Sequence, residues 1–254
     1  MKAVTVRGLT IGRGVPKICV PIAFEKEEEI IKAAREIKKS PADLVEWRAD
    51  WYKDIDDVQA VTKLLQVLRE ILGDLPLLMT FRTKQEGGER EIAAEEYAAL
   101  YQKAMETGCV DLIDVELMMD ETIVNRLITK AHECGVNVIS SNHDFDKTPD
   151  KDEIIHRLKA MDKAGADILK IAVMPRSSAD VLTLLDATRQ MHEDLTEKPM
   201  ITMSIGQLGV ISRIAGQTFG SAVTFGSLGK ASAPGQIDAG KLKEILEILQ
   251  RKNP

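Results

Sequence analysis

Cysteine is scarce in this chain, whose 254 residues include only Cys19, Cys109 and Cys134. These three show neither a CxxC pair nor a Cys/His ligand spacing, which excludes a disulfide framework and a cysteine-based metal site. Long apolar runs are also missing. No stretch of about 18 apolar residues occurs, and the N-terminal MKAVTVRGLTIGRG has no continuous apolar core, so we expect neither a membrane span nor a secretory signal. A reducing cytoplasm is the expected location, with all three cysteines as core or near-surface thiols.

Basic charge is in short supply as well. Lys and Arg total 34 against 40 Asp and Glu, a net charge of −6, and no basic run is present. This balance argues against a nucleic acid or an anionic membrane as partner. The hydrophobic share of 44% and the charged share of 29% are ordinary for a globular protein. We expect one folded domain over residues 1–254.

Short apolar runs rich in β-branched residues recur along the chain. There are eight of them: KICVPI, LVEWRA, LLMTF, LIDVEL, VNVISS, ILKIAV, MITMS and AVTF. Segments with helical periodicity lie between the runs, among them VQAVTKLLQVLREIL and KDEIIHRLKAMDKAG. Strands that are buried on both faces and joined by helical crossovers form a parallel sheet. The pattern therefore predicts an α/β fold, and a closed (β/α)8 TIM barrel fits it better than an open sheet.

Segments at the two ends of the chain add to this barrel. The N-terminal AVTVRGLTIG reads as a β-hairpin with Arg7-Gly8 near its turn, and we expect it to close the bottom of the barrel. The stretch GSLGKASAPGQ, residues 226–236, follows the eighth strand, where we expect a functional loop that acts as a lid. Thr148 is expected to cap a helix that begins at Pro149. Glycines stand where three of the helices need a left-handed C-cap: Gly108, Gly135 and Gly165.

Ionisable residues near the C-terminal ends of the strands are candidate site residues, because barrels of this kind carry their active sites there. The candidates, with one methionine, are Glu46, Arg48, Arg82, Glu86, Asp114, Glu116, His143, Lys170, Met203 and Arg213.

Several candidates have a structural alternative. Glu46 and Arg48 are two residues apart and can equally form a structural ion pair, His143 can lie beside a helix cap, and Met203 is more typical of a core. Asp114 and Glu116 are best interpreted as a buried network that holds the barrel's cationic residues in place.

Lys170 is the most informative candidate, because it stands inside the apolar run ILKIAV. A lysine is almost never fully buried unless it is paired or neutral. We expect neighbouring cations such as Arg48, Arg82 and Arg213 to favour the neutral amine, which can attack a carbonyl carbon and form an imine. The iminium acidifies the adjacent C–H, and His143, the one histidine at a predicted strand end, is suited to take that proton.

Seven segments of the sequence form one pattern: EWRAD at 46–50, FRTKQEGG at 81–88, SNHDF at 141–145, LKIAVMP at 169–175, ITMS at 201–204, GVISRIAGQTFGSAVTFG at 209–226 and ASAPGQI at 231–237. In order and spacing they resemble the type I 3-dehydroquinate dehydratases of the shikimate pathway, over essentially the whole chain. The resemblance implies a (β/α)8 barrel, usually a homodimer. It also implies dehydration of 3-dehydroquinate to 3-dehydroshikimate by syn elimination, on the way to chorismate and the aromatic amino acids, with no metal and no cofactor.

The resemblance also implies roles for single residues. Lys170 forms the imine with the C3 carbonyl, His143 is the general base and acid, and Glu86 orients and charges His143. Arg213 binds the substrate carboxylate. The residues that hold the ring hydroxyls and the carboxylate are Glu46, Arg48, Arg82, Ser232 and Gln236, and those of the apolar wall are Met203, Phe225 and Ala233.

Two positions depart from the family's usual pattern, which has Ser at the position of Pro21 and Met at that of Ile205. A polar contact from the first strand is therefore expected to be absent, and the apolar wall to be slightly changed.

Two other functions remain open at this point. A class I aldolase also places a lysine on the sixth strand and needs an anion site in the last loops, which the glycines and Lys230 of GSLGKASAPGQ can imitate. A non-catalytic barrel that senses a quinate-like acid typically lacks the lysine or the histidine, and this chain has both.

Overall fold

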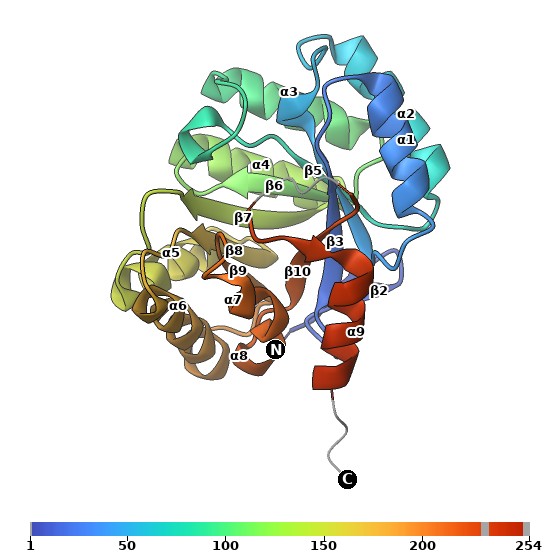
Figure 1. Cartoon of the computed structure of the whole chain (residues 1–254). Coiled ribbons are helices and arrows are strands. Elements are labelled where there is room, and N and C mark those ends of the chain that lie inside the picture. Colours follow the sequence, from blue (N-terminus) through green and yellow to red (C-terminus); the bar gives the residue numbers. More distant parts are fainter. Residues whose placement is uncertain (1, 230–233, 251–254) are drawn as a thin grey trace.

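A computed structural model describes residues 2–229 and 234–250 of the chain. Its centre is a ring of parallel strands whose order follows the sequence, and Figure 1 shows helices around this ring. The eight strands are β3 (Lys17–Ile22), β4 (Leu44–Arg48), β5 (Leu77–Thr80), β6 (Leu112–Glu116), β7 (Asn137–Asp144), β8 (Ile168–Val173), β9 (Met200–Ser204) and β10 (Val223–Ser227). Each predicted run overlaps one of these strands, so the predicted (β/α)8 barrel is confirmed.

Strand β10 closes the ring, and it is paired more extensively with β3 than with β9. Strand β10 pairs with β3 over Val223 to Phe225. Between β9 and β10 there is only an isolated bridge from Met200 to Ser221, and the N–H of Ala222 donates to the Met200 carbonyl at 2.7 Å. The short strand β11 (Ile237–Asp238) continues the sheet beside the end of β10.

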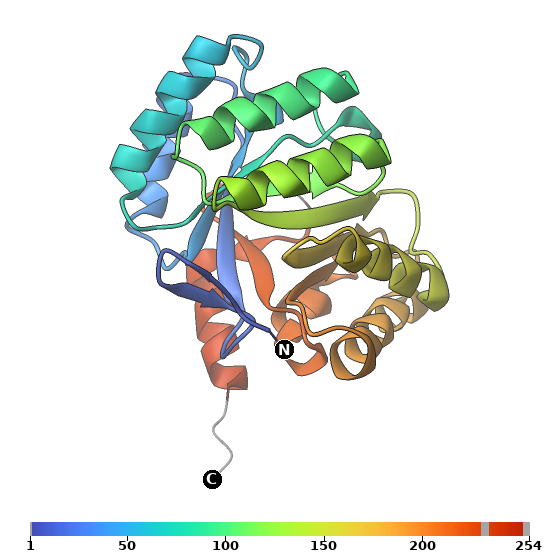
Figure 2. The same ribbon diagram turned by 180° about the vertical axis from the view of Figure 1, so that it is seen from behind.

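Amphipathic helices cover the outside of the barrel, as Figures 1 and 2 show from opposite sides. They are α1 (Glu27–Ile37), α2 (Val58–Leu72), α3 (Ala94–Glu106), α4 (Glu121–Glu133), α5 (Lys151–Lys163), α6 (Ser178–Gln190) and α9 (Ala239–Leu249). The shorter elements are η1 (Ala49–Trp51), η2 (Lys84–Glu86), η3 (Met191–Leu195), α7 (Val210–Ile214) and α8 (Gly216–Phe219). No helix within the described ranges has both the length and the apolar character needed to cross a membrane.

Helix ends follow the sequence with one exception. Gly108, Gly135 and Gly165 have φ of 66°, 70° and 95°, as expected for left-handed C-caps. The predicted cap at Thr148 is wrong: α5 begins after Asp150, whose side chain accepts the Glu153 N–H at 2.9 Å. The hydroxyl of Thr148 instead donates to the Met174 carbonyl at 3.0 Å. A carboxylate next to the first turn was the stronger cap.

The predicted N-terminal hairpin closes the lower end of the barrel. Its strands are β1 (Val4–Val6) and β2 (Leu9–Ile11), and positive φ values at Arg7 and Gly8 form the tight turn. Val6 and Ile11 are buried in one cluster with Leu44, Leu112 and Ile168, which face the inside of the barrel. This apolar plug occupies the N-terminal ends of the strands and leaves the C-terminal ends for polar residues.

Candidate active site

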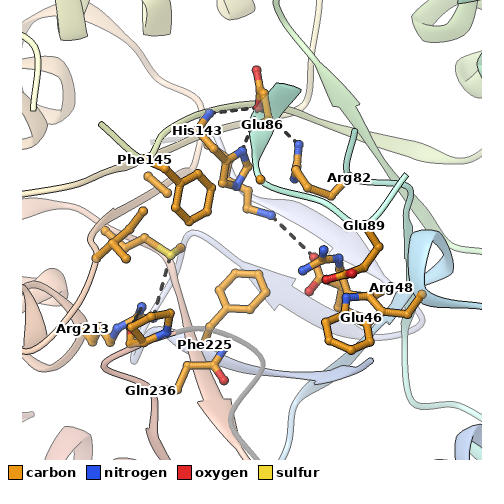
Figure 3. Close-up of a pocket in the computed structure, with 17 residues that line it drawn as sticks. Glu46, Arg48, Arg82, Glu86, Glu89, His143, Phe145, Arg213, Phe225 and Gln236 are labelled. Carbon is orange, nitrogen blue, oxygen red and sulfur yellow. Dashed lines mark hydrogen bonds and ion pairs between the residues drawn. The ribbon is translucent and has the colours of Figure 1, made fainter. Parts of the chain in front are cut away.

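A cavity of about 240 Å³ lies at the C-terminal ends of the strands. Figure 3 shows its charged side chains converging from several strands and loops. Ten predicted site residues line it: Glu46, Arg48, Arg82, Glu86, His143, Lys170, Met203, Arg213, Phe225 and Gln236. Ser232 and Ala233 lie outside the described residues, as do Lys230 and Ala231 of the expected lid.

Lys170 projects from β8 into the barrel and is only 3% exposed. Its Nζ lies 2.8 Å from Asp114 Oδ2 and 3.6 Å from Glu46 Oε1, and it stands 4.9 Å from the centre of the Phe225 ring. The ion-pair partners of this amine are carboxylates, while the expected neighbouring cations Arg48, Arg82 and Arg213 line the same cavity. Residues two apart on a strand share a face, so Leu112 in the apolar plug and Asp114 above it both point into the barrel.

His143, which is partly buried, pairs with the buried Glu86. Nδ1 of His143 lies 2.9 Å from Glu86 Oε2, and the His143 backbone N–H donates to the same oxygen at 2.9 Å. Asn142 donates to Oε1 at 3.0 Å, so the carboxyl group is fixed at both oxygens.

The charges around this pair favour a neutral imidazole. Burial lowers the pKa of His143 well below its usual value, and the cations Arg82 and Lys170 act in the same direction. Burial raises the pKa of Glu86 to about 8, although the Arg82 guanidinium opposes that shift. A neutral imidazole with Nδ1 tied to Glu86 has Nε2 available as a base.

Arg82 is the centre of a buried ion network. Its NH2 lies 2.9 Å from Asp114 Oδ1, and its NH1 lies 2.7 Å from Glu116 Oε1 and 3.4 Å from Glu86 Oε2. Burial lowers the pKa of Arg82, but Asp114, Glu116 and Glu86 outweigh it and raise that pKa. The network interpretation of Asp114 and Glu116 is thus confirmed, since both hold a cation of the barrel in place.

Arg48 is held by a carboxylate that the sequence analysis did not select. Its Nε and NH2 donate to Asp50 Oδ1 and Oδ2 at 2.8 and 2.7 Å. Asp50 is fully buried and also accepts the backbone N–H groups of Arg82 and Glu89. The alternative of a Glu46–Arg48 pair is wrong for the described residues, because Glu46 pairs with Lys170 and accepts the Thr80 hydroxyl at 2.9 Å.

Arg213, at the end of α7, is a buried cation without an acidic partner in the described part of the chain. Only 3% of the residue is exposed, and burial lowers its pKa to about 10. Its contacts are weak ones, from NH1 to Met203 Sδ at 3.8 Å and from NH2 to the Pro234 carbonyl at 3.3 Å, and its buried Nε has no hydrogen-bond partner there. A guanidinium in this state is suited to bind an anionic ligand.

Comparison with known proteins places the chain in a family. The model of the family described as type I 3-dehydroquinase matches residues 18–253. The chain is a type I 3-dehydroquinase family member. It is 51% identical to the 3-dehydroquinate dehydratase of Bacillus licheniformis over 250 residues, 98% of each chain.

Solved structures of type I 3-dehydroquinases and related dehydratases have the same fold. The type I 3-dehydroquinate dehydratase of Clostridium difficile, described with covalently modified comenic acid, is 46% identical, with a TM-score of 0.96 and 98% of both chains covered. The 3-dehydroquinate dehydratase of Geobacillus kaustophilus is 40% identical, with a TM-score of 0.95 over 98% of this chain and 96% of the other.

The cavity of this type I 3-dehydroquinase is also lined by residues that were not predicted as site residues. They are Trp51, Gly87, Glu89, Phe145, Ala172 and Pro234, whereas Ile205 was expected in the apolar wall. Strand periodicity gives a signal for two of them, because Ala172 and Phe145 follow Lys170 and His143 by two residues. The Phe145 ring stacks 6.4 Å from the His143 ring. Across the described ranges, no group of three or more His, Cys, Asp or Glu residues is placed to hold a metal ion.

Proposed function

We propose that this protein is a 3-dehydroquinate dehydratase that forms an imine between Lys170 and the C3 carbonyl of its substrate. Family membership and close similarity to named dehydratases support the activity, a hydro-lyase step of the shikimate pathway. One observation carries the mechanism: a buried lysine on the cavity wall shares that cavity with a hydrogen-bonded histidine–carboxylate pair. An amine and a neighbouring base are the two groups that this elimination requires.

Binding of the substrate uses the polar residues around the lysine. Arg213 receives the substrate carboxylate, because it is the buried guanidinium of the cavity that lacks an acidic partner in the described chain. Arg48, held by Asp50, and Glu46 face the ring hydroxyls. The family resemblance assigns hydroxyl and carboxylate contacts to Arg82, Gln236 and Ser232 as well, and assigns the apolar wall to Met203, Phe225 and Ala233.

The reaction begins when the Lys170 amine adds to C3. The carbonyl oxygen leaves as water and takes two protons of the original ammonium, so that an iminium cation remains on Nζ. His143 then removes the C2 proton, and the C2–H electron pair forms the C2=C3 bond of an enamine. The enamine electrons expel the C1 hydroxyl, which takes the proton from His143 and leaves as water. Hydrolysis of the conjugated iminium releases the product and restores Lys170.

The same imidazole handles both protons on one face of the ring, which gives syn elimination. Glu86 keeps Nδ1 engaged, so that the proton moves through Nε2. We further propose that the protein acts in the cytoplasm, as its few scattered cysteines indicate, and as a homodimer, as the family resemblance implies.

Trapping of the covalent intermediate tests this proposal. The protein is incubated with 3-dehydroquinate and reduced with borohydride, and the added mass is located on digested peptides. We expect a reduced adduct on the peptide that contains Lys170, and none in Lys170→Ala, whose turnover is also lost. An exposed lysine such as Lys103 provides a matched Lys103→Ala control that retains the adduct.

Two other outcomes contradict the proposal, and each indicates one of the two alternative functions. Binding of the substrate with neither adduct nor turnover indicates a sensor of a quinate-like acid. Cleavage of a sugar phosphate, with no turnover of 3-dehydroquinate, indicates an aldolase.

A further inference from the structure

Asp114 contacts the reacting nitrogen without lining the cavity. Its Oδ2 lies 2.8 Å from Lys170 Nζ, and its side chain is fully buried. Lys170 is among the described residues that line the cavity, as is Glu46, whereas Asp114 is not. The carboxylate of Asp114 therefore reaches Nζ from inside the barrel, beneath the cavity, where a substrate bound in the cavity does not displace it.

Other groups hold this carboxylate in a fixed orientation. Its Oδ1 accepts hydrogen bonds from Arg82 NH2 at 2.9 Å and from the Ser141 hydroxyl, which leaves Oδ2 for Lys170. Its backbone carbonyl accepts from the hydroxyl groups of Tyr97 and Tyr101 at 3.2 and 2.6 Å. A carboxylate fixed in this way requires little rearrangement when the ammonium group at Nζ becomes an iminium.

The proposed reaction requires a lasting positive charge at that nitrogen. An ammonium and a carbonyl give an iminium and water, so one positive charge is present at Nζ before and after imine formation. The charge disappears only in the enamine and returns when the C1 hydroxyl leaves. An imine without a nearby anion loses its proton more readily, and a neutral imine is a much weaker electron sink.

We infer that Asp114 is the counter-ion of the Lys170 iminium and keeps the imine nitrogen protonated during turnover. The inference rests on the proposed function, because it requires an imine at Lys170. Glu46 is less suited to the role, since it lies 3.6 Å from Nζ and faces the cavity. Asp114 is thus assigned a catalytic role in addition to its part in the network around Arg82.

Glu116 offers a matched control on the same strand. It also binds Arg82, at 2.7 Å, and it makes no ion pair with Lys170 in the described structure. Asp114→Asn and Glu116→Gln each remove one negative charge from Arg82, but only the first removes a charge from Nζ. Any effect specific to Asp114→Asn therefore reports on the nitrogen of Lys170.

The test compares the pH dependence of turnover and of borohydride trapping in the wild type and these two variants. We expect the alkaline limit of kcat to move down by about one pH unit in Asp114→Asn. Trapping at alkaline pH should slow in parallel, because borohydride reduces iminium ions. The Glu116→Gln profile should keep the wild-type alkaline limit, even where its overall rate changes.

Two outcomes overturn the inference while leaving the imine intact. The first is an unchanged alkaline limit in Asp114→Asn, and the second is an equal shift in Glu116→Gln, which assigns the effect to Arg82. Absence of an adduct in the wild type overturns the proposed function itself, so the two failures are distinguishable.

A wild-type measurement decides the question if Asp114→Asn does not fold. In enzyme labelled with ζ-15N lysine, the imine formed with the product 3-dehydroshikimate is followed by NMR against pH. The counter-ion role predicts a nitrogen that remains protonated up to about pH 8.5. Loss of the proton near neutral pH contradicts it.

Discussion

At the scale of single residues, His143 separates imine formation from the proton transfers that follow. His143→Ala removes the base but leaves Lys170 and its carboxylates in place. We expect the imine to form and kcat to fall by about a hundredfold to ten-thousandfold, which is the usual contribution of a general base. Borohydride trapping during turnover should show the adduct accumulating in the variant. An adduct that stays at the wild-type level would contradict the role of His143.

The same residue sets an expected acid limit for activity. Burial, Arg82 and Lys170 lower the pKa of His143 below its usual 6.5. A base with a lowered pKa stays unprotonated to lower pH, so kcat/KM should remain high through pH 6.5 and fall only as the pH drops through the lowered value. The measurement is kcat/KM against pH at constant ionic strength. An acid limit at or above 6.5 would show that the free enzyme holds a protonated imidazole.

Arg213 combines a cost in stability with a gain in binding. A buried cation without an acidic partner is unfavourable, and in the proposed complex the substrate carboxylate becomes that partner. Arg213→Met should raise KM by about tenfold to a hundredfold and leave Tm unchanged or higher. Arg126→Met, which breaks an exposed ion pair with Glu95, is the control with unchanged KM. An unchanged KM in Arg213→Met would remove Arg213 from the carboxylate site.

At the scale of elements, the loop after β5 fixes the position of Glu86. Glu116 accepts the Thr83 N–H at 2.8 Å, and the N–H of Gly88 donates to the Thr83 carbonyl at 2.8 Å. A Cβ at Gly88 would lie 1.9 Å from the carbonyl oxygen of Arg82, which is backbone and cannot rotate away. The loop therefore closes only with glycine at this position.

Gly88→Ala should displace the loop and lower kcat/KM by about a hundredfold, because a shift of about 1 Å at a catalytic group has that effect. Gly108→Ala is the control: its φ of 66° is strained for alanine, but no heavy atom lies within 4 Å of the added Cβ. The control should lose about 1 kcal/mol of stability and keep its kcat/KM. Wild-type activity in Gly88→Ala would mean that the loop tolerates the displacement.

Elements were more predictable from the sequence than contacts between side chains. Each strand of the barrel is buried on both faces, so it appears as a short apolar run that is visible without any partner. The carboxylate partners of Lys170 were not predicted, because Asp114 and Glu46 reach it from strands that are distant in the sequence. Such pairings depend on barrel register, which one sequence does not reveal. Residue spacing gave no signal for Trp51 or Glu89, which enter the cavity from the short helix η1 and from the loop after η2.

At the scale of the whole molecule, the barrel separates stability from chemistry. The N-terminal ends of the strands carry the apolar plug with Val6 and Ile11, and the C-terminal ends carry the cavity. A cavity made in the plug should therefore lower stability without changing the site.

Ile11→Ala tests this separation, because Ile11 is completely buried in the plug. Loss of its side chain should lower the stability by about 2–5 kcal/mol and lower Tm by several degrees. KM and kcat at room temperature should stay at their wild-type values. Thr5→Ala changes an exposed residue of the same hairpin and should leave both properties unchanged. Thermal unfolding and steady-state kinetics on the three proteins provide the comparison. A fall in kcat that accompanies the fall in Tm would mean that the plug and the cavity are coupled through the strands, because Ile168 in the plug and Lys170 at the cavity lie two residues apart on β8.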